Sequence, residues 1–127
     1  MMPAEEKGEP QETEPKRVIW IASSRKDLRA FPEDVKDVIG FALYQAQIGK
    51  KHVSAKPLKG YGGAGVVEIV EDHDTNTYRA VYTVKFKGAV YVLDAFQKKS
   101  KKGARTPQAD IERNNKRLKA AHDHYKQ

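Results

Sequence analysis

The chain has 127 residues, a length that favours a single domain, and its hydrophobic content of 39% suits a small protein with much surface for its volume. It contains no cysteine, which excludes disulfides, thiolate nucleophiles and zinc–thiolate sites. It has neither a signal-peptide pattern nor a run of roughly 18 apolar residues, so we expect a cytoplasmic protein with no membrane partner.

Charge is distributed unevenly along the chain. The net charge is +7, but residues 1–15 contain five glutamates and one lysine, which leaves +11 on residues 16–127. A body of this charge attracts polyanions such as nucleic acid, although a lysine-rich surface can also serve solubility alone. Because residues 1–16 combine prolines and glutamates with no apolar run, we predict a disordered acidic tail there, followed by one domain over 17–127.

The first part of the domain predicts a strand and two helices. Residues 17–22 form a short apolar run typical of a strand. Ser23 or Ser24 is placed to cap a short helix that ends near Ala30, and a second helix is expected over 32–49, with proline in its first turn and glycine at its end. The residues predicted to face the core from this second helix are Val35, Val38, Ile39, Ala42, Leu43 and Ala46.

The glycines of residues 60–65 spell G-x-G-x-x-G, a pattern shared with nucleotide-binding loops. A dinucleotide site requires a strand before this motif and a helix after it, whereas here the expected order is reversed, and a kinase needs far more chain. We interpret the glycines as a sharp turn into the sheet. Lys56 and Lys59 flank the turn, and we expect them to face the same place as Lys98.

Three strands are expected next, over residues 66–72, 78–86 and 89–96. Residues 73–76 supply the first turn, and the Lys87-Gly88 pair supplies the second. The third strand is apolar almost throughout, which predicts a central place in its sheet.

Alternation in the second of these strands separates two faces. The expected core face carries Tyr78, Ala80, Tyr82, Val84 and Phe86, and the opposite face carries Arg79, Val81, Thr83 and Lys85. Glu68 is a lone carboxylate in the preceding apolar strand. It is either a solvent-facing residue, a partner of Arg79, or a base in a phosphate site, with the last ranked second.

A burst of positive charge follows the third strand. Within residues 97–102, lysines occupy positions 98, 99, 101 and 102. A rigid strand that delivers these lysines beside Arg79 predicts a phosphate-binding site. The final helix is expected to begin at Thr106-Pro107.

The final helix has only a narrow apolar stripe, formed by Ile111, Leu118, Ala121 and Tyr125. Its other positions carry Arg113, Lys116, Arg117 and Lys119, so we expect it to pack lightly and to contact a partner or the RNA backbone. His122 and His124 lie two positions apart on this helix and point in different directions, so no metal site is predicted.

The segments SSRKDLRAFPEDV, KPLKGYGGAG-VVE, YRAVYTV and FQKKSKKGARTP, in this order, resemble the phage-derived, HigB-like branch of the RelE/ParE toxin superfamily over roughly residues 17–125. The resemblance implies an α+β fold in which two N-terminal helices cover one face of a small, mostly antiparallel sheet, with a C-terminal helix. The element order read from the residues, β-α-α-β-β-β-α, agrees. It also implies a type II toxin that cleaves messenger RNA on the ribosome without a cofactor and is neutralised by a helix-turn-helix antitoxin.

Metal-free RNA cleavage uses the 2′-hydroxyl as nucleophile, so the protein must transfer protons and stabilise a pentavalent phosphorane. The resemblance assigns catalytic positions to Arg79, within the YR-x-x-Y motif, and to Lys98 and Lys99 after the last strand. Asp94 stands where relatives often carry histidine, and it either carries a proton or orients Lys98 or Arg79. The RNA-binding candidates are Lys56, Lys59, Lys85, Phe96, Lys101 and Lys102, of which Phe96 is suited to stacking a base.

Two other functions stay open at this point. ParE-type members share the fold but bind DNA gyrase without cleaving RNA, and a basic RNA-binding module without chemistry would have the same charge. The lysine cluster beside Arg79 favours RNA, because a gyrase binder needs no convergent phosphate site.

Overall fold

The computed structural model describes residues 14–63, 65–98 and 107–127. Its elements, in chain order, are β1 (Arg17–Trp20), α2 (Ser24–Arg29), α3 (Glu33–Gln47), β2 (Lys56–Pro57), β3 (Val66–His73), β4 (Asn76–Thr83), β5 (Ala89–Lys98) and α4 (Pro107–Tyr125). The predicted acidic tail, as far as residue 13, lies outside the described residues. None of the helices in the described ranges has the length and apolarity that crossing a membrane would require.

The strands form one five-stranded sheet in the order β1-β5-β4-β3-β2. β1 runs parallel to β5, and the other neighbours are antiparallel, so the predicted α+β fold with a mostly antiparallel sheet is confirmed. β5 is apolar because it lies between β1 and β4 and is covered on both faces. The edge strand β2 was not predicted, because two residues carry no periodic signal.

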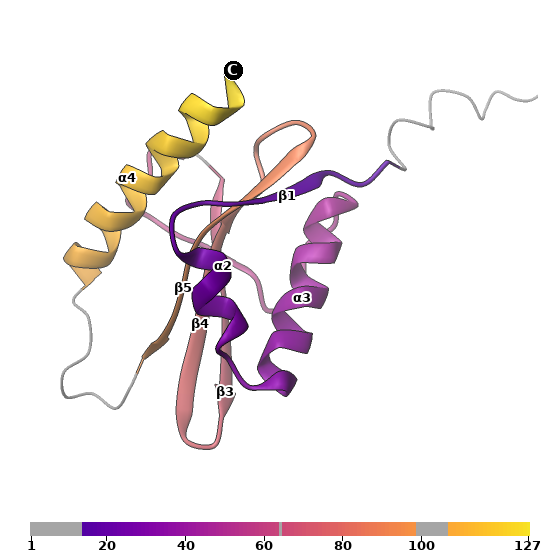
Figure 1. Cartoon of the computed structure of the whole chain (residues 1–127), viewed down its shortest axis with the longest axis vertical. Helices are drawn as coiled ribbons and strands as arrows, with labels where there is room; N and C mark the ends of the chain where they lie inside the picture. The colour runs from indigo at the N-terminus through magenta and orange to yellow at the C-terminus, as the bar shows by residue number, and fades with distance from the viewer. Residues whose placement is uncertain (1–13, 64, 99–106) are drawn as a thin grey trace, which may run out of the picture.

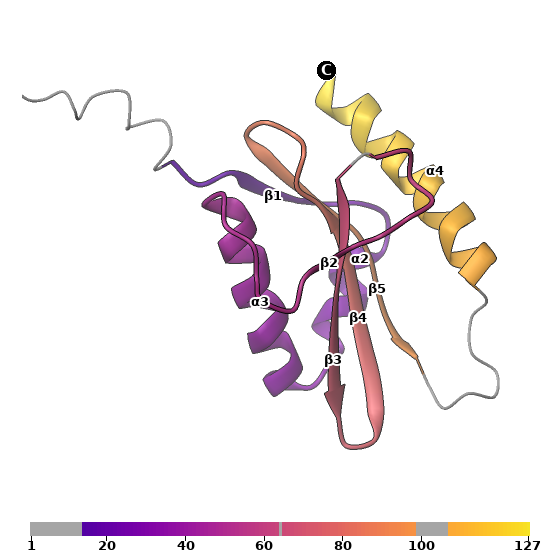
Figure 2. The ribbon, with the colours of Figure 1, turned by 180° about the vertical axis from the view of Figure 1, so that it is seen from behind.

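The helices cover the two faces of the sheet separately (Figure 1 and Figure 2). α2 and α3 pack on one face, over a core that includes Val35, Ile39, Leu43, Ile69, Tyr82 and Val92. α4 covers the other face, over a second cluster that includes Tyr61, Val81, Phe86, Tyr91, Leu93 and Leu118. Of the six residues predicted to face the core from α3, five are buried and Val38 is half-buried.

The hairpin between β3 and β4 turns through Asp74 and Thr75. Both residues have positive φ, 50° and 65°, as a two-residue type I′ turn requires. Their strand neighbours His73 and Asn76 are paired directly across the turn. The turn was expected at these residues, although it contains no glycine.

The prediction that Phe86 shares a face with Tyr78 and Tyr82 is wrong. β4 ends at Thr83, and the chain leaves the strand before Phe86, so alternation no longer fixes the direction of this side chain. The ring of Phe86 instead packs in the α4 cluster, with its centroid 4.8 Å from that of Tyr91. Val84, also expected in the core, is 38% exposed.

A β-bulge interrupts the pairing of β5 with β4. Tyr82 is opposite Val92, but the next residue back, Val81, is opposite Asp94, so Leu93 is the extra residue. Leu93 belongs to the α4 cluster, and Asp94 also contacts α4. The bulge therefore turns two consecutive side chains toward the last helix.

Candidate active site

A pocket of about 210 Å³ lies on the α4 face of the sheet, between the strands, the first half of α4 and the segment that precedes β3. It is lined by Leu58, Lys59, Tyr61, Glu68, Arg79, Val81, Phe96, Lys98, Asp110, Ile111 and Asn114. The lining combines apolar side chains with cations, carboxylates, an amide and a phenol, and the strands themselves supply Glu68, Arg79 and Lys98. Such a pocket can hold a charged group while keeping part of it away from water.

Strand register brings Arg79 and Lys98 together. Arg79 on β4 is opposite Phe96 on β5, and Thr77 is opposite Lys98. Arg79 and Lys98 are therefore diagonal neighbours on one face of adjacent strands. Two cations held by rigid strands are suited to binding a phosphate group, because their positions need no reordering when the ligand arrives.

Glu68 on β3 fixes the guanidinium of Arg79. Nη1 of Arg79 donates to Oε2 of Glu68 at 2.8 Å, and the two side chains are 26% and 14% exposed. The expectation that Glu68 is a partner of Arg79 is confirmed. Nε of Arg79 is buried and has no acceptor among the described residues. The ion pair thus orients the guanidinium and leaves it with donor capacity.

Asp110, in the first turns of α4, brings a second carboxylate to the pocket. It accepts a hydrogen bond from Nη2 of Arg113 at 2.7 Å. Burial raises the pKa of Asp110, and the charge of Asp94 adds to this, whereas Lys98 and Arg79 act in the opposite direction. A carboxylate with a raised pKa is a stronger base than an ordinary aspartate.

Tyr61 and Asn114 close the pocket beside Asp110. Both side chains are buried, and Asn114 donates to the backbone carbonyl of Asp110 at 3.1 Å. Burial raises the pKa of Tyr61, while the Asn114 amide opposes the shift. The phenol therefore stays protonated at neutral pH and can donate a hydrogen bond.

Residues 26–119 match the model of the phage-derived Gp49-like protein family. The chain belongs to this family. The Gp49-like chain also has the fold of Escherichia coli toxin RelE, solved as a double arginine-to-alanine mutant in the free state, with a TM-score of 0.54 and 16% identity. The superposition covers 84% of the Gp49-like chain and 97% of the RelE chain. A comparison with curated proteins gave no significant match.

Asp94 of the Gp49-like chain is buried against α4. Its carboxylate accepts hydrogen bonds from Arg113 at 2.7 Å, from Arg117 at 3.2 Å and from Asn114 at 3.1 Å. None of these three partners was assigned to it from the sequence. Asp94 does not line the pocket.

The other predicted site residues are dispersed. Lys59 and Phe96 line the pocket, and the guanidinium carbon of Arg113 lies 5.8 Å from the centre of the Phe96 ring. Lys56 is exposed on β2, opposite Glu68, and lies outside the pocket lining. Lys85 lines a different hollow. Lys99, Lys101 and Lys102 lie outside the described residues.

The polar face of α4 was misinterpreted. Arg113 and Arg117 were expected on its exposed surface, but both turn toward the sheet and pair with Asp94. The inward residues Asp110, Arg113, Asn114 and Arg117 recur at spacings of three and four, which is the signal that the sequence offered. That spacing identifies a shared face without telling whether it meets solvent or protein.

The described residues contain no group of three or more His, Asp or Glu side chains placed to hold a metal ion. The polar groups that line this Gp49-like pocket are three cations, two carboxylates, a phenol and an amide.

Proposed function

We propose that this chain is the toxin of a type II toxin–antitoxin pair, of the HigB-like kind, and that it cleaves ribosome-bound messenger RNA in the cytoplasm. The observation that carries the proposal is the pocket in which Arg79 and Lys98 lie beside Glu68 and Asp110. The RelE-like fold supports the toxin class, because the structurally similar chain is a toxin. A helix-turn-helix antitoxin is the proposed protein partner.

The proposed reaction is attack of a ribose 2′-oxygen on the adjacent phosphorus. The bond from phosphorus to the 5′-oxygen breaks, which yields a 2′,3′-cyclic phosphate and a free 5′-hydroxyl. Arg79 and Lys98 stabilise the charge that develops on the non-bridging oxygens. Preorganised donors of this kind typically contribute about 3–4 kcal/mol each to the transition state.

Two proton transfers accompany the attack. Asp110 takes the proton from the 2′-hydroxyl, since burial makes it a stronger base than an ordinary aspartate. Lys98 donates a proton to the departing 5′-oxygen. Glu68 acts as a positioning residue through Arg79, and Asp94 acts as a positioning residue through α4.

The strand of RNA needs further contacts along its length. The sequence candidates for these are Lys56, Lys59, Lys85, Phe96, Lys99, Lys101 and Lys102. Lys59 and Phe96 are supported by their place in the pocket lining. Stacking of a base on Phe96 would compete with the Arg113 guanidinium that lies over its ring.

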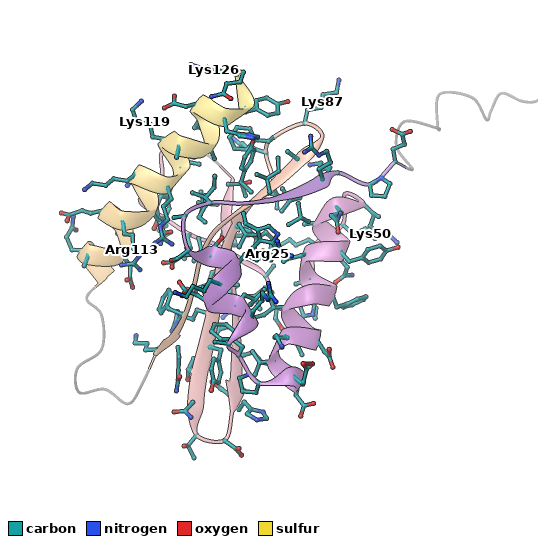
Figure 3. The ribbon with its side chains drawn as sticks, viewed as in Figure 1. Arg25, Lys50, Lys87, Arg113, Lys119 and Lys126 are labelled. Atoms are coloured by element: carbon teal, nitrogen blue, oxygen red, sulfur yellow. The ribbon has the colours of Figure 1, made fainter. Side chains whose placement is uncertain are left out.

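The decisive test compares Arg79→Ala with Arg25→Ala in single-turnover cleavage of a message bound to ribosomes. Arg25 is an exposed arginine on α2, away from the pocket, and serves as the charge-matched control (Figure 3). Arg79→Ala should lower the cleavage rate by about 10²–10³ with an unchanged circular dichroism spectrum. A folded Arg79→Ala protein that cleaves at the parent rate would remove Arg79 from the mechanism.

Pulse labelling after expression of the chain separates the alternatives. Arrest of translation with cleaved messages is expected. If DNA synthesis stopped first while messages stayed intact, the chain would belong with gyrase poisons. If messages stayed intact and the purified chain bound RNA tightly in a separate binding assay, the chain would be a binding module without chemistry.

Substitution of Lys98 distinguishes charge from proton transfer. Arginine keeps the charge but holds its proton, because its pKa stays above about 12. If Lys98 donates the proton, Lys98→Arg should be nearly as inactive as Lys98→Ala. Full activity of Lys98→Arg would restrict Lys98 to phosphate binding.

A further inference from the structure

A second hollow, of about 560 Å³, lies on the α3 side of the sheet and is lined by four lysines. They come from three separate segments: Lys16 precedes β1, Lys50 and Lys51 follow α3, and Lys85 follows β4. Lys50 is seen at the end of α3 in Figure 3. The fold thus collects cations that are far apart in the sequence at one place.

These cations are not neutralised by the protein around them. No aspartate or glutamate lines the hollow, and in the part of the chain that the structure describes no carboxylate pairs with any of the four lysines. Nζ of Lys16 donates to the backbone carbonyl of Val84 at 3.4 Å, and Nζ of Lys85 donates to that of Gly63. Neutral acceptors therefore hold two of the ammonium groups and leave their charge for a ligand.

The rest of the lining is mostly apolar. Its residues include Ala46, Pro57, Leu58, Val67 and Tyr82. A lining that combines cations with apolar side chains matches a nucleotide chain, in which charged phosphates alternate with sugars and bases that have apolar faces. The volume falls in the range of known ligand sites, about 300–1,000 Å³.

Gly65 allows Lys85 to lie across this hollow. Its φ is +67°, and a Cβ added there would meet Cγ of Lys85 at 2.3 Å. The amide of Val84 donates to the carbonyl of Gly65 at 2.9 Å, which ties the loop to the residue before Lys85. The absence of a side chain at position 65 is therefore part of how this lysine is placed.

The lysine hollow adjoins the candidate active site. Leu58 lines both, and the segment that follows it, called the ridge below, supplies Lys59 and Tyr61 to the pocket and Gly63 to the hollow. Figure 2 shows the segment between α3 and β3 passing from the α3 side of the sheet to the α4 side. A strand held in one pocket needs only to cross this ridge to enter the other.

We propose that the hollow lined by Lys16, Lys50, Lys51 and Lys85 binds backbone phosphates of the same RNA strand that is cut beside Arg79. This inference rests on the proposed function for the identity of the strand. The geometry that carries it is the adjacency of two cationic pockets across one ridge. The hollow is then a substrate subsite a few nucleotides from the scissile phosphate.

Binding is measured with fluorescent oligonucleotides of about 4 and about 12 nucleotides, which span the site sizes of single-strand binders. They carry 2′-O-methyl groups, so that no 2′-oxygen can attack and binding is separated from cleavage. Lys50→Ala/Lys51→Ala should lower the affinity for the longer oligonucleotide about tenfold. It should also lower the slope of log affinity against log salt concentration by about 1.4, near 0.7 for each phosphate contact. The shorter oligonucleotide should bind unchanged. Lys85→Ala should act in the same length-dependent way.

The control is Lys26→Ala/Lys36→Ala, which removes the same charge from helices outside both pockets. The proposal is overturned if the Lys50/Lys51 variant binds the longer oligonucleotide no more weakly than this control does. It is overturned equally if the variant loses the same affinity for both oligonucleotide lengths. It is also overturned if that variant keeps its RNA affinity but loses affinity for a synthetic peptide of the acidic residues 1–15. Parent-level cleavage by Arg79→Ala would remove the proposed function and leave the length-dependent binding result intact.

Discussion

Asp94 of β5 and Arg113 of α4 are joined at 2.7 Å, and this pair ties the last helix to the sheet face that carries the candidate active site. Arg117 adds a second contact to the same carboxylate at 3.2 Å. Because α4 also supplies Asp110, the place of the proposed base depends on a contact one helical turn away from it.

Asp94→Asn is expected to destabilise the protein by about 3 kcal/mol, because it removes a buried countercharge from two guanidinium groups. Urea unfolding followed by circular dichroism measures this. Asp123→Asn is the control, since its pair with Lys119 is exposed and contributes at most about 1 kcal/mol. If Asp94→Asn kept the parent stability and lost cleavage, Asp94 would act in proton transfer itself.

Glu68→Gln keeps the shape of the side chain but removes the charge that holds Arg79. We expect the single-turnover rate to fall about ten- to a hundredfold through misplacement of the guanidinium. The profile of this rate against pH should keep its shape. Glu71→Gln, on the same strand but the opposite face, is the control. Loss of the acidic limb of the profile in Glu68→Gln alone would make Glu68 the base.

Asp110 should give stability a specific pH dependence. Burial raises its pKa in the folded protein above the unfolded value of about 3.9. Its contribution is therefore fully present below about pH 4 and is lost as the pH rises through the folded pKa. As the pH rises through this interval, the free energy of unfolding of Asp110→Asn should increase relative to that of the parent, as measured by urea unfolding at each pH. An increase of the parent relative to the variant over the same pH interval would contradict a raised pKa of Asp110.

Thr75→Gly should stabilise the β3–β4 hairpin. A β-branched residue at a φ of 65° is strained, and glycine relieves a cost of about 1 kcal/mol there. The melting temperature is the measurement. Thr77→Gly is the comparison, because Thr77 lies within β4 and donates to Asp72 at 2.9 Å, so its loss should destabilise. Equal effects of the two changes would argue against strain in the turn.

Local patterns were enough to predict most of the architecture. The apolar run of β5 predicted a strand buried on both faces, and the 3.6-residue stripe of α3 predicted which side of the helix is buried. Both predictions were confirmed. The alternation of side chains in β4 placed Arg79 on the face opposite Tyr78 and Tyr82. Its pairing with Glu68 on the neighbouring strand was among the expectations for Glu68. These features depend on neighbours that are close in sequence or joined by a short turn.

Features that depend on distant contacts were missed. Phe86 was assigned by alternation beyond the end of its strand, and packing against Tyr91 decided its direction instead. Arg113 and Arg117 look like surface charges until the buried carboxylate of Asp94 is placed beneath them. The role of Asp110 could not be anticipated, because its raised pKa arises from burial on a helix whose docking the sequence does not display.

The extra residue in β5 divides this strand into two halves in antiphase. Before the bulge, odd-numbered residues such as Tyr91 face α4, and after it even-numbered residues such as Phe96 do. Without this bulge the same residues would alternate without interruption, and Asp94, Phe96 and Lys98 would share a face with Val90 and Val92, beneath α3. The extra residue therefore puts the cationic site on the α4 face, so the position of the site is set by a count of residues as well as by their kinds.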